Sequence, residues 1–293
     1  MSAGSEVERP VRVAGQPPAA RPDEPGARVS EAPRPPGSVA GSPLLVSCLV
    51  AAILLASWEA LAASHLVSTV ALPGPLHVLH DFVRTLTVGY GSTTLLGQAE
   101  ISLFRISAGF VGAVLLGVPV GLAMGGSRFV HAAIDPLLQF LRPVPPLAFI
   151  PLLVIWFGIG ELSKILLIFF CTLPVVIINT AAGVAAVQSL RLRVAQCFGA
   201  TRWQLFRHVV LPSVLPDVFT GMRVAIGIAW TCLVAAEMVA ASRGLGWMVM
   251  QAGNNLQSGL VFVSIISIGV IGYAMDLLIR TCERWAVPWK GRA

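Results

Sequence analysis

Charged side chains within apolar stretches are the residues of this 293-residue chain that are best placed to do chemistry. Glu237 lies in TCLVAAEMVAA, and Arg142 heads a proline-broken apolar segment that also contains Pro146. A charge at membrane depth is costly unless it is paired or faces a polar path, so such residues mark functional sites by default. Glu237 can bind a cationic group of a solute, or it can pair with another side chain or serve a gate. Arg142 can line a solute path or extend to the cytoplasmic interface.

Enzyme-type motifs are absent from the sequence. It contains no G-x-x-x-x-G-K-[ST] loop for nucleotide phosphates and no H-E-x-x-H metal motif. The five cysteines are scattered without metal-type spacing, and His77 and His80 lack a third ligand nearby. We therefore expect no catalytic residue, no metal site and no bound cofactor in this chain.

The segment from residue 188 to 216 is basic and amphipathic, and it is far longer than a hairpin loop needs to be. Leu205 and Val209 share one helical stripe, and arginines fall between or opposite the apolar positions. Gly199 interrupts the pattern, and Pro212 and Pro216 are expected to end it. The pattern predicts a short helix, a turn and a second helix outside the lipid. An amphipathic loop resting on the membrane surface is the alternative.

The spacing of this segment resembles the cytoplasmic signature of ABC importer permeases, E-A-A, three residues, G, nine residues, I, one residue, L-P. Arg193 stands where that family usually has Glu, and Val194 stands where it has the first Ala. The resemblance implies a coupling helix that docks on a separate ATPase subunit, which would bind ATP and Mg²⁺. The coupling residues that it implies are Arg193, Val194, Ala195, Gly199, Ala200, Arg202, Trp203, Val209, Leu211 and Pro212.

Composition places the chain in a membrane. It is 56% hydrophobic and 12% charged, whereas a soluble domain carries about a quarter charged residues. The net charge of +6 comes with arginines beside apolar runs, which is typical of the positive-inside pattern and not of a nucleic-acid surface. We expect the lipid bilayer as a partner and no nucleic acid.

Apolar runs predict an all-α polytopic protein with six transmembrane helices. The expected spans are residues 44–63, 106–124, 134–160, 165–187, 218–241 and 260–279. Prolines 143, 145, 146 and 151 forbid one straight helix in the third span, and broken backbone in a membrane must be buried or line a wet cavity. A five-span alternative would merge this segment with its neighbour and place the 188–216 loop outside.

Two further features constrain the arrangement. Gly109, Ala113, Gly117 and Gly121 recur every four residues, which predicts close approach by another helix. With six spans and both termini in the cytoplasm, the arginine-rich loop and the C-terminal basic cluster lie inside, as the positive-inside rule requires. Residues 1–42 are expected to be a disordered cytoplasmic tail. The permease domain is then 43–293, with its coupling loop at 188–216.

The resemblance extends from about residue 46 to the end of the chain. This part is similar to the nitrate, aliphatic sulfonate and taurine branch of these permeases, and its last segment looks most like the taurine permeases. It implies the type I importer permease fold in a bacterial inner membrane. It also implies a homodimer, an ATPase subunit and a periplasmic or lipid-anchored binding protein. The expected activity is import of a small organic sulfonate, taurine first, by alternating access. Other sulfonates, nitrate and pyrimidine precursors are alternatives.

Two function classes compete with this expectation. A secondary transporter needs several charged residues within its spans and usually an internal repeat, and a membrane enzyme needs clustered titratable groups. The sequence shows none of these. For a taurine-like solute, Glu237 can meet the ammonium group, although a structural or gating role is the favoured interpretation.

Overall fold

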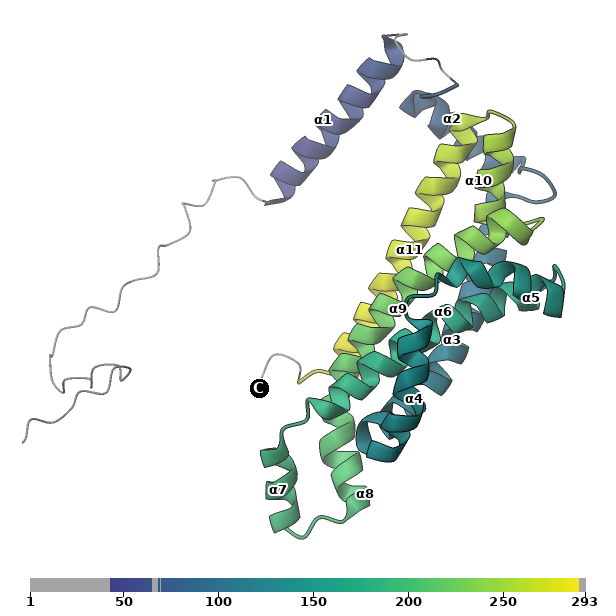
Figure 1. The fold of residues 1–293 in the computed structure, drawn as a ribbon. Helices are drawn as coiled ribbons and strands as arrows, with labels where there is room; N and C mark the ends of the chain where they lie inside the picture. Colours follow the sequence, from purple (N-terminus) through teal and green to yellow (C-terminus); the bar gives the residue numbers. More distant parts are fainter. Residues whose placement is uncertain (1–42, 65–67, 69, 290–293) are drawn as a thin grey trace, which may run out of the picture. The chain divides into compact units, whose positions relative to one another are not determined.

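A computed structural model describes the chain except for residues 1–42, 65–67, 69 and 290–293, so the expected N-terminal tail lies outside the described residues (Figure 1). Within the described part the chain forms helices and turns, with one isolated bridge between Tyr90 and Thr93 and no strand. The chain separates into two units after Ala51, and every contact discussed below lies within the second. The helices are α1 (Pro43–Ala63), α2 (Pro75–Thr87), α3 (Leu95–Gly126), α4 (Arg128–Leu141), η1 (Pro146–Phe149), α5 (Ile150–Phe157), α6 (Glu161–Ala185), α7 (Ser189–Cys197), α8 (Arg202–Leu205), η2 (Phe206–Val210), α9 (Leu211–Ala240), α10 (Leu245–Asn254) and α11 (Ser258–Ala286).

The all-α, six-span prediction is confirmed, with the third span broken. Five stretches are long and apolar enough to cross a membrane, and the pair formed by α4 and residues 146–157 counts as a sixth. That pair bends by 91° at the proline-rich break, as its four prolines predict. The second span is longer than expected, because α3 begins at Leu95 and carries buried polar side chains in its first turns.

Small residues allow the central helices α3, α6 and α9 to pack closely. A Cβ at Gly109 would lie 2.7 Å from the Cβ of Ile168, and one at Gly121 would lie 2.6 Å from the Cβ of Thr180. On the other side of α6, a Cβ at Gly221 would lie 2.6 Å from the Cβ of Asn179. The predicted close approach along the glycine stripe is therefore confirmed, and its partner is α6.

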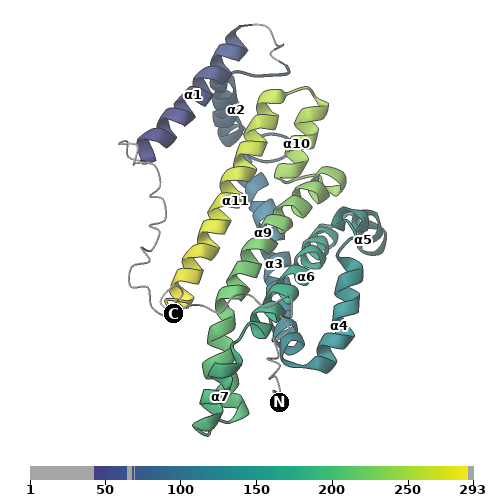
Figure 2. The same cartoon turned by 60° about the vertical axis from the view of Figure 1, so that its left-hand side comes forward.

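The main core lies where these helices meet α11. Its fully buried members include Ile106, Ile168 and Leu233, with Trp230 nearly so. In both views α2 and α10 lie at one end of this bundle and α7 and α8 at the other (Figures 1 and 2). The bundle therefore presents two separate ends, one carrying the predicted coupling segment.

An amphipathic helix follows the Pro-Gly-Pro turn of residues 73–75. It is α2, which begins at Pro75 and buries Val78 and Thr85. Val78 packs with Leu245 and Met248 of α10 and with Val263 of α11. This satellite core holds the α10 end of the bundle together.

Candidate functional site

The predicted coupling segment folds as a helical hairpin around Gly199. Helix α7 ends at Cys197, and Gly199 takes a left-handed φ of +77°, a conformation that favours glycine. The next helix begins with a capping box, in which Thr201 and Gln204 bond to each other's backbone N–H groups. These local signals turn the chain sharply, and a new helix begins at Arg202 after four non-helical residues.

The second helix of the hairpin does not stop at Pro212 or Pro216, so that expectation is wrong. Residues 206–210 form a π-helical turn in which the Leu211 N–H donates to the Phe206 carbonyl. Pro212 lies directly after this turn, near the start of α9, and Pro216 is accommodated inside the helix. The result is one helical run from Arg202 to Ala240 that leads from the hairpin directly into a span.

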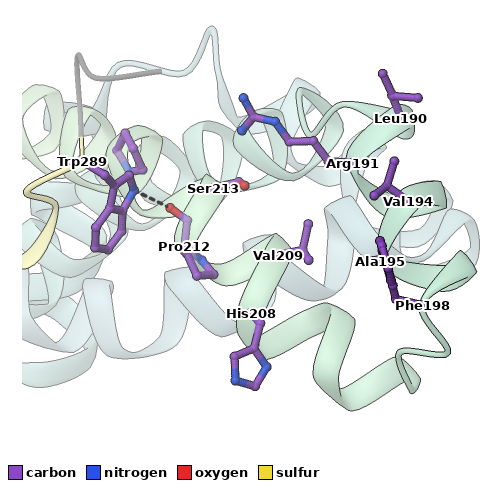
Figure 3. A pocket seen from close by; sticks show the side chains of 11 residues that line it. Leu190, Arg191, Val194, Ala195, Phe198, His208, Val209, Pro212, Ser213 and Trp289 are labelled. Atoms are coloured by element: carbon purple, nitrogen blue, oxygen red, sulfur yellow. Dashed lines mark hydrogen bonds between the residues drawn. The ribbon is translucent and has the colours of Figure 1, made fainter.

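A groove of about 980 Å³ lies between α7 and the start of α9 (Figure 3). Val194, Ala195 and Phe198 line one side, and Val209 and Pro212 line the other. At the far end the indole N–H of Trp289 donates to the Pro212 carbonyl over 3.3 Å. The apolar lining is open to an entering side chain.

Not all of the predicted coupling residues line this groove. Val194, Ala195, Val209 and Pro212 do, whereas Arg193, Gly199, Ala200, Arg202, Trp203 and Leu211 do not. Arg193, Arg202 and Trp203 are exposed on the hairpin, and Trp203 stacks on Phe206 with ring centroids 5.7 Å apart. Phe198 is 88% exposed at the hairpin tip. The hairpin thus carries exposed aromatic and cationic side chains around an apolar groove.

The pathway candidates Arg142 and Pro146 line a second cavity together. It measures about 580 Å³ and lies between the α4–α5 bend and α6. Trp156 and Phe149 come from the bent pair, and Asn179 comes from α6. The structure therefore brings two of the three pathway candidates to one place.

Glu237, the third pathway candidate, lies elsewhere, fully buried near the end of α9. Its Oε1 accepts a hydrogen bond from Arg105 Nη1 at 2.7 Å, and Ser102 Oγ donates to the same oxygen at 2.8 Å. Its Oε2 accepts from the backbone N–H of Gly246 at 2.9 Å. This is the geometry of a structural pair, in which the carboxylate has no free oxygen for a solute.

Arg105 extends the network to a third helix and to a loop. Its Nη2 donates to Glu161 Oε1 at 2.7 Å, its Nε donates to Glu161 Oε2, and its Nη1 also donates to the Arg243 carbonyl at 2.8 Å. Glu161 is half exposed, whereas Arg105 is 2% exposed. The guanidinium therefore joins α3, the start of α6 and the end of α9 at one point.

Helix α10 begins inside the same network. The Gly244 N–H donates to Gln98 Oε1 at 2.6 Å, and the Leu245 N–H donates to Ser102 Oγ at 2.9 Å. A Cβ at Gly244 would lie 2.4 Å from Glu237 Oε1, so the backbone can approach only because that residue is glycine. The R-G-L-G turn of residues 243–246 is thus held in place by buried side chains of α3 and α9.

Sequence reasoning missed Arg105, Ser102 and Gln98. The expected second span began at residue 106, so Arg105 lay just outside it. A usable signal existed, because an arginine in one apolar run and a glutamate in another favour a buried pair. Arg223 of α9 also has a partner: its Nε lies 3.2 Å from Asp276 Oδ1 on α11.

Comparisons with known proteins show the family to which the chain is similar. A family model described as "Binding-protein-dependent transport system inner membrane component" matches residues 113–287. The taurine transport system permease protein TauC of Escherichia coli is 44% identical over 244 residues, which cover 82% of this chain and 88% of that protein. The putative aliphatic sulfonates transport permease protein SsuC of Bacillus subtilis is 36% identical, covering 83% and 86% of the two chains. The nitrate import permease protein NrtB of Synechococcus elongatus is 33% identical, covering 87% and 97%.

Among solved structures, the inward-facing MetNI methionine ABC transporter has a similar fold. The match has a TM-score of 0.51 at 18% identity and covers 64% of this chain and 95% of that one. At that identity the likeness concerns the fold alone.

Proposed function

The chain belongs to the family of binding-protein-dependent transport system inner membrane components, as a multi-pass ABC importer permease that is a transport subunit and not an enzyme, and we propose that its solute is a small organic sulfonate, taurine first. The identity to the taurine permease, higher than to the sulfonate and nitrate permeases compared above, supports this order of solutes. Aliphatic sulfonates are the next solute class.

We further propose that the hairpin is the contact through which ATP binding by an ATPase subunit drives the movement of this chain. The observation that carries this is the apolar groove between α7 and the start of α9, on a hairpin whose second helix continues unbroken into a span. An ATPase subunit bound to the hairpin would move α9 as a rigid body. Because a ligand shifts an equilibrium only through its different affinity for two states, the hairpin must be held differently before and after ATP binding.

The assembly follows from this arrangement. Two copies of the chain would form the path, each resting on an ATPase subunit that binds ATP and Mg²⁺. A periplasmic or lipid-anchored binding protein would deliver solute at the α2 and α10 end, opposite the hairpin. Both chain termini would then lie in the cytoplasm, which agrees with the arginines of residues 188–216.

The test is uptake of radiolabelled taurine by proteoliposomes that hold the chain, the ATPase that copurifies with it and a taurine-loaded binding protein. Uptake is expected with ATP and is expected to disappear when the ATP site of the ATPase is disabled. Unlabelled ethanesulfonate and nitrate in excess rank the alternative solutes. Uptake that persists without the ATPase and follows an ion gradient would identify a secondary transporter and overturn the proposal.

A further inference from the structure

We propose that the cavity inside the α4–α5 bend is a binding site for a small organic oxyanion and that Arg142 is the group that binds the anion. The proposal rests on the proposed function and deepens it, because it assigns the solute a place and a mode of recognition. The argument uses the depth of the cavity, its charge and its shape.

The cavity lies at the middle of the membrane-spanning helices. The α6 residues that line it run from Phe170 to Asn179, in the centre of a helix that extends from Glu161 to Ala185. Leu138, one turn before Arg142, packs with Ile177 of α6. Arg142 therefore stands level with the centre of a span.

This depth argues against the alternative that Arg142 extends to the cytoplasmic interface. Helix α4 has 14 residues between the turn at Ser127 and Arg142. At 1.5 Å per residue it separates Arg142 from that turn by roughly 21 Å, farther than an arginine side chain can reach back. A cation at this depth marks a functional site, and the cavity beside it is where it can act.

The lining favours an anion over a cation. None of the residues that line the cavity is acidic, and its polar groups besides the Cys171 thiol and the Trp156 indole N–H are those of Arg142 and Asn179. Within the described part of the chain, the Arg142 side chain makes no hydrogen bond and no ion pair. A guanidinium without a partner matches the paired oxygens of a sulfonate or carboxylate.

The shape suits a small organic solute. The volume of about 580 Å³ falls in the range of known ligand pockets. The broken backbone between Leu141 and Pro146 borders it, and backbone of this kind is tolerated at membrane depth where it lines a cavity. Trp156, Phe149 and Phe170 offer ring faces that can hold an ammonium group or a short carbon chain.

Recognition of the sulfonate is therefore assigned to Arg142, and an ammonium group is accommodated without a carboxylate. Glu237 takes no part, because both of its oxygens are bonded to protein donors. It follows that ethanesulfonate should bind in the cavity as taurine does, and that a plain amine should not.

The test places a thiol in the cavity and measures which reagent reaches it. Ile178 lines the cavity and is 38% exposed, so Ile178→Cys is made in a full-length chain whose five native cysteines are replaced. The chain is held in lipid nanodiscs so that both membrane faces are open. Sulfonatoethyl methanethiosulfonate carries an anion and trimethylammonioethyl methanethiosulfonate carries a cation of similar size, and their reaction rates are compared.

The anionic reagent is expected to react about tenfold faster, because a cleft lined by one sign of charge concentrates the opposite ion. Excess taurine or ethanesulfonate should slow that reaction, and ethylamine should not. Arg142→Gln should abolish the preference and Arg142→Lys should keep it. Arg128→Gln is the matched control, since Arg128 is on the same helix but lines a different cavity, and it should leave the preference unchanged.

Three results would overturn the proposal: equal rates for the two reagents, a preference that survives Arg142→Gln, or no reaction with either reagent. The last result would show that lipid or a second copy of the chain fills the cavity. A matched elution profile in gel filtration excludes misfolding of the variants. The reaction of the thiol with these reagents requires neither ATP nor an ATPase, so its outcome is independent of the outcome of the uptake experiment.

Discussion

The guanidinium of Arg105 is bonded to two carboxylates and one carbonyl that come from different parts of the chain. It is 2% exposed and reaches Glu161 on α6, Glu237 on α9 and the backbone of Arg243. A buried charge is costly without partners, and removing one partner from such a pair costs more than the pair contributes. The cluster therefore fixes how three spans meet at the α10 end of the bundle.

Glu237→Gln is expected to destabilise the protein by about 3 to 5 kcal/mol. The uncharged amide leaves Arg105 with Glu161, which is half exposed, and it can turn an N–H group toward the N–H of Gly246. Thermal unfolding of the purified protein in detergent measures the loss, and taurine uptake by the surviving protein measures function.

Glu100→Gln is the control for this change. Glu100 is on the same helix as Arg105 but is exposed, so its replacement should leave the unfolding temperature unchanged. If Glu237→Gln keeps full stability and abolishes uptake, the structural interpretation is wrong and a role in the solute path returns. Unchanged uptake with unchanged stability would remove Glu237 from both roles.

At the scale of the residue, sequence could find Glu237 and Arg142 but not their environments. Both stood out because they are charged within apolar runs. Only the fold shows that α3 brings Arg105 to Glu237 from 132 positions away, whereas the α4–α5 bend leaves Arg142 beside a cavity with no partner among the described residues. Long-range pairing depends on helix packing, which the local pattern does not encode.

Among the elements, the hairpin of α7 and α8 depends on one backbone conformation. Gly199 has a φ of +77°, and a Cβ built on it meets no atom within 4 Å. A substitution there is strained by the backbone and not by crowding. A β-branched residue suits a positive φ worst.

Gly199→Val is therefore expected to leave the spans folded and to uncouple the hairpin from its ATPase. Local strain of about 1 to 2 kcal/mol would reshape the turn while the unfolding temperature of the spans hardly moves. The measurement is ATP turnover by the copurified ATPase in the presence of loaded binding protein, which should fall to the basal rate. Gly199→Asn, which tolerates the left-handed region, should retain most of the stimulation. Full stimulation in the valine variant would contradict the coupling role of the hairpin.

Helix ends were the least predictable feature of the elements. The prolines at 212 and 216 indicate a helix end by local rules, yet the π-helical turn at 206–210 shifts the hydrogen bonds and lets the helix pass. In α3 the buried polar residues Gln98 and Ser102 lie before the expected start of the span at residue 106, and they bond to the start of α10. The six spans themselves were predictable, because apolar length is a strong and local signal.

The contact between α3 and α6 gives a prediction about stability. Gly121→Ala places a Cβ 2.6 Å from the Cβ of Thr180 and 2.8 Å from the Ile177 carbonyl, so the helices must separate. Overpacking of this kind costs about 1 to 3 kcal/mol, and thermal unfolding in detergent should show it. Gly112→Ala is the control on the same helix, because its Cβ would lie 3.4 Å from the ring of Phe169. Equal unfolding temperatures for the two variants would mean that the packing is looser than described.

At the scale of the whole molecule, the distribution of charge sets the direction of insertion. The hairpin carries Arg191, Arg193, Arg202 and Arg207 and no acidic residue between 188 and 216. The opposite end, formed by α2 and α10, holds the buried Arg105 network. Basic loops are retained in the cytoplasm, so the hairpin is expected to face inward and to meet its ATPase there.

Cys197 reports on this topology, because it is exposed at the end of α7. With the other exposed cysteines, Cys48 and Cys282, replaced by serine, a membrane-impermeant maleimide should label Cys197 in inside-out vesicles and not in spheroplasts. Ser92→Cys in the same background, with Cys197 also replaced, is the control for the opposite side, since Ser92 is exposed in the turn before α3, and it should label in spheroplasts. The two patterns must be opposite, because α3, the bent pair and α6 separate the two positions by three crossings. Labelling of Cys197 from the periplasmic side would place the hairpin away from ATP, and no cytoplasmic ATPase could then drive the path.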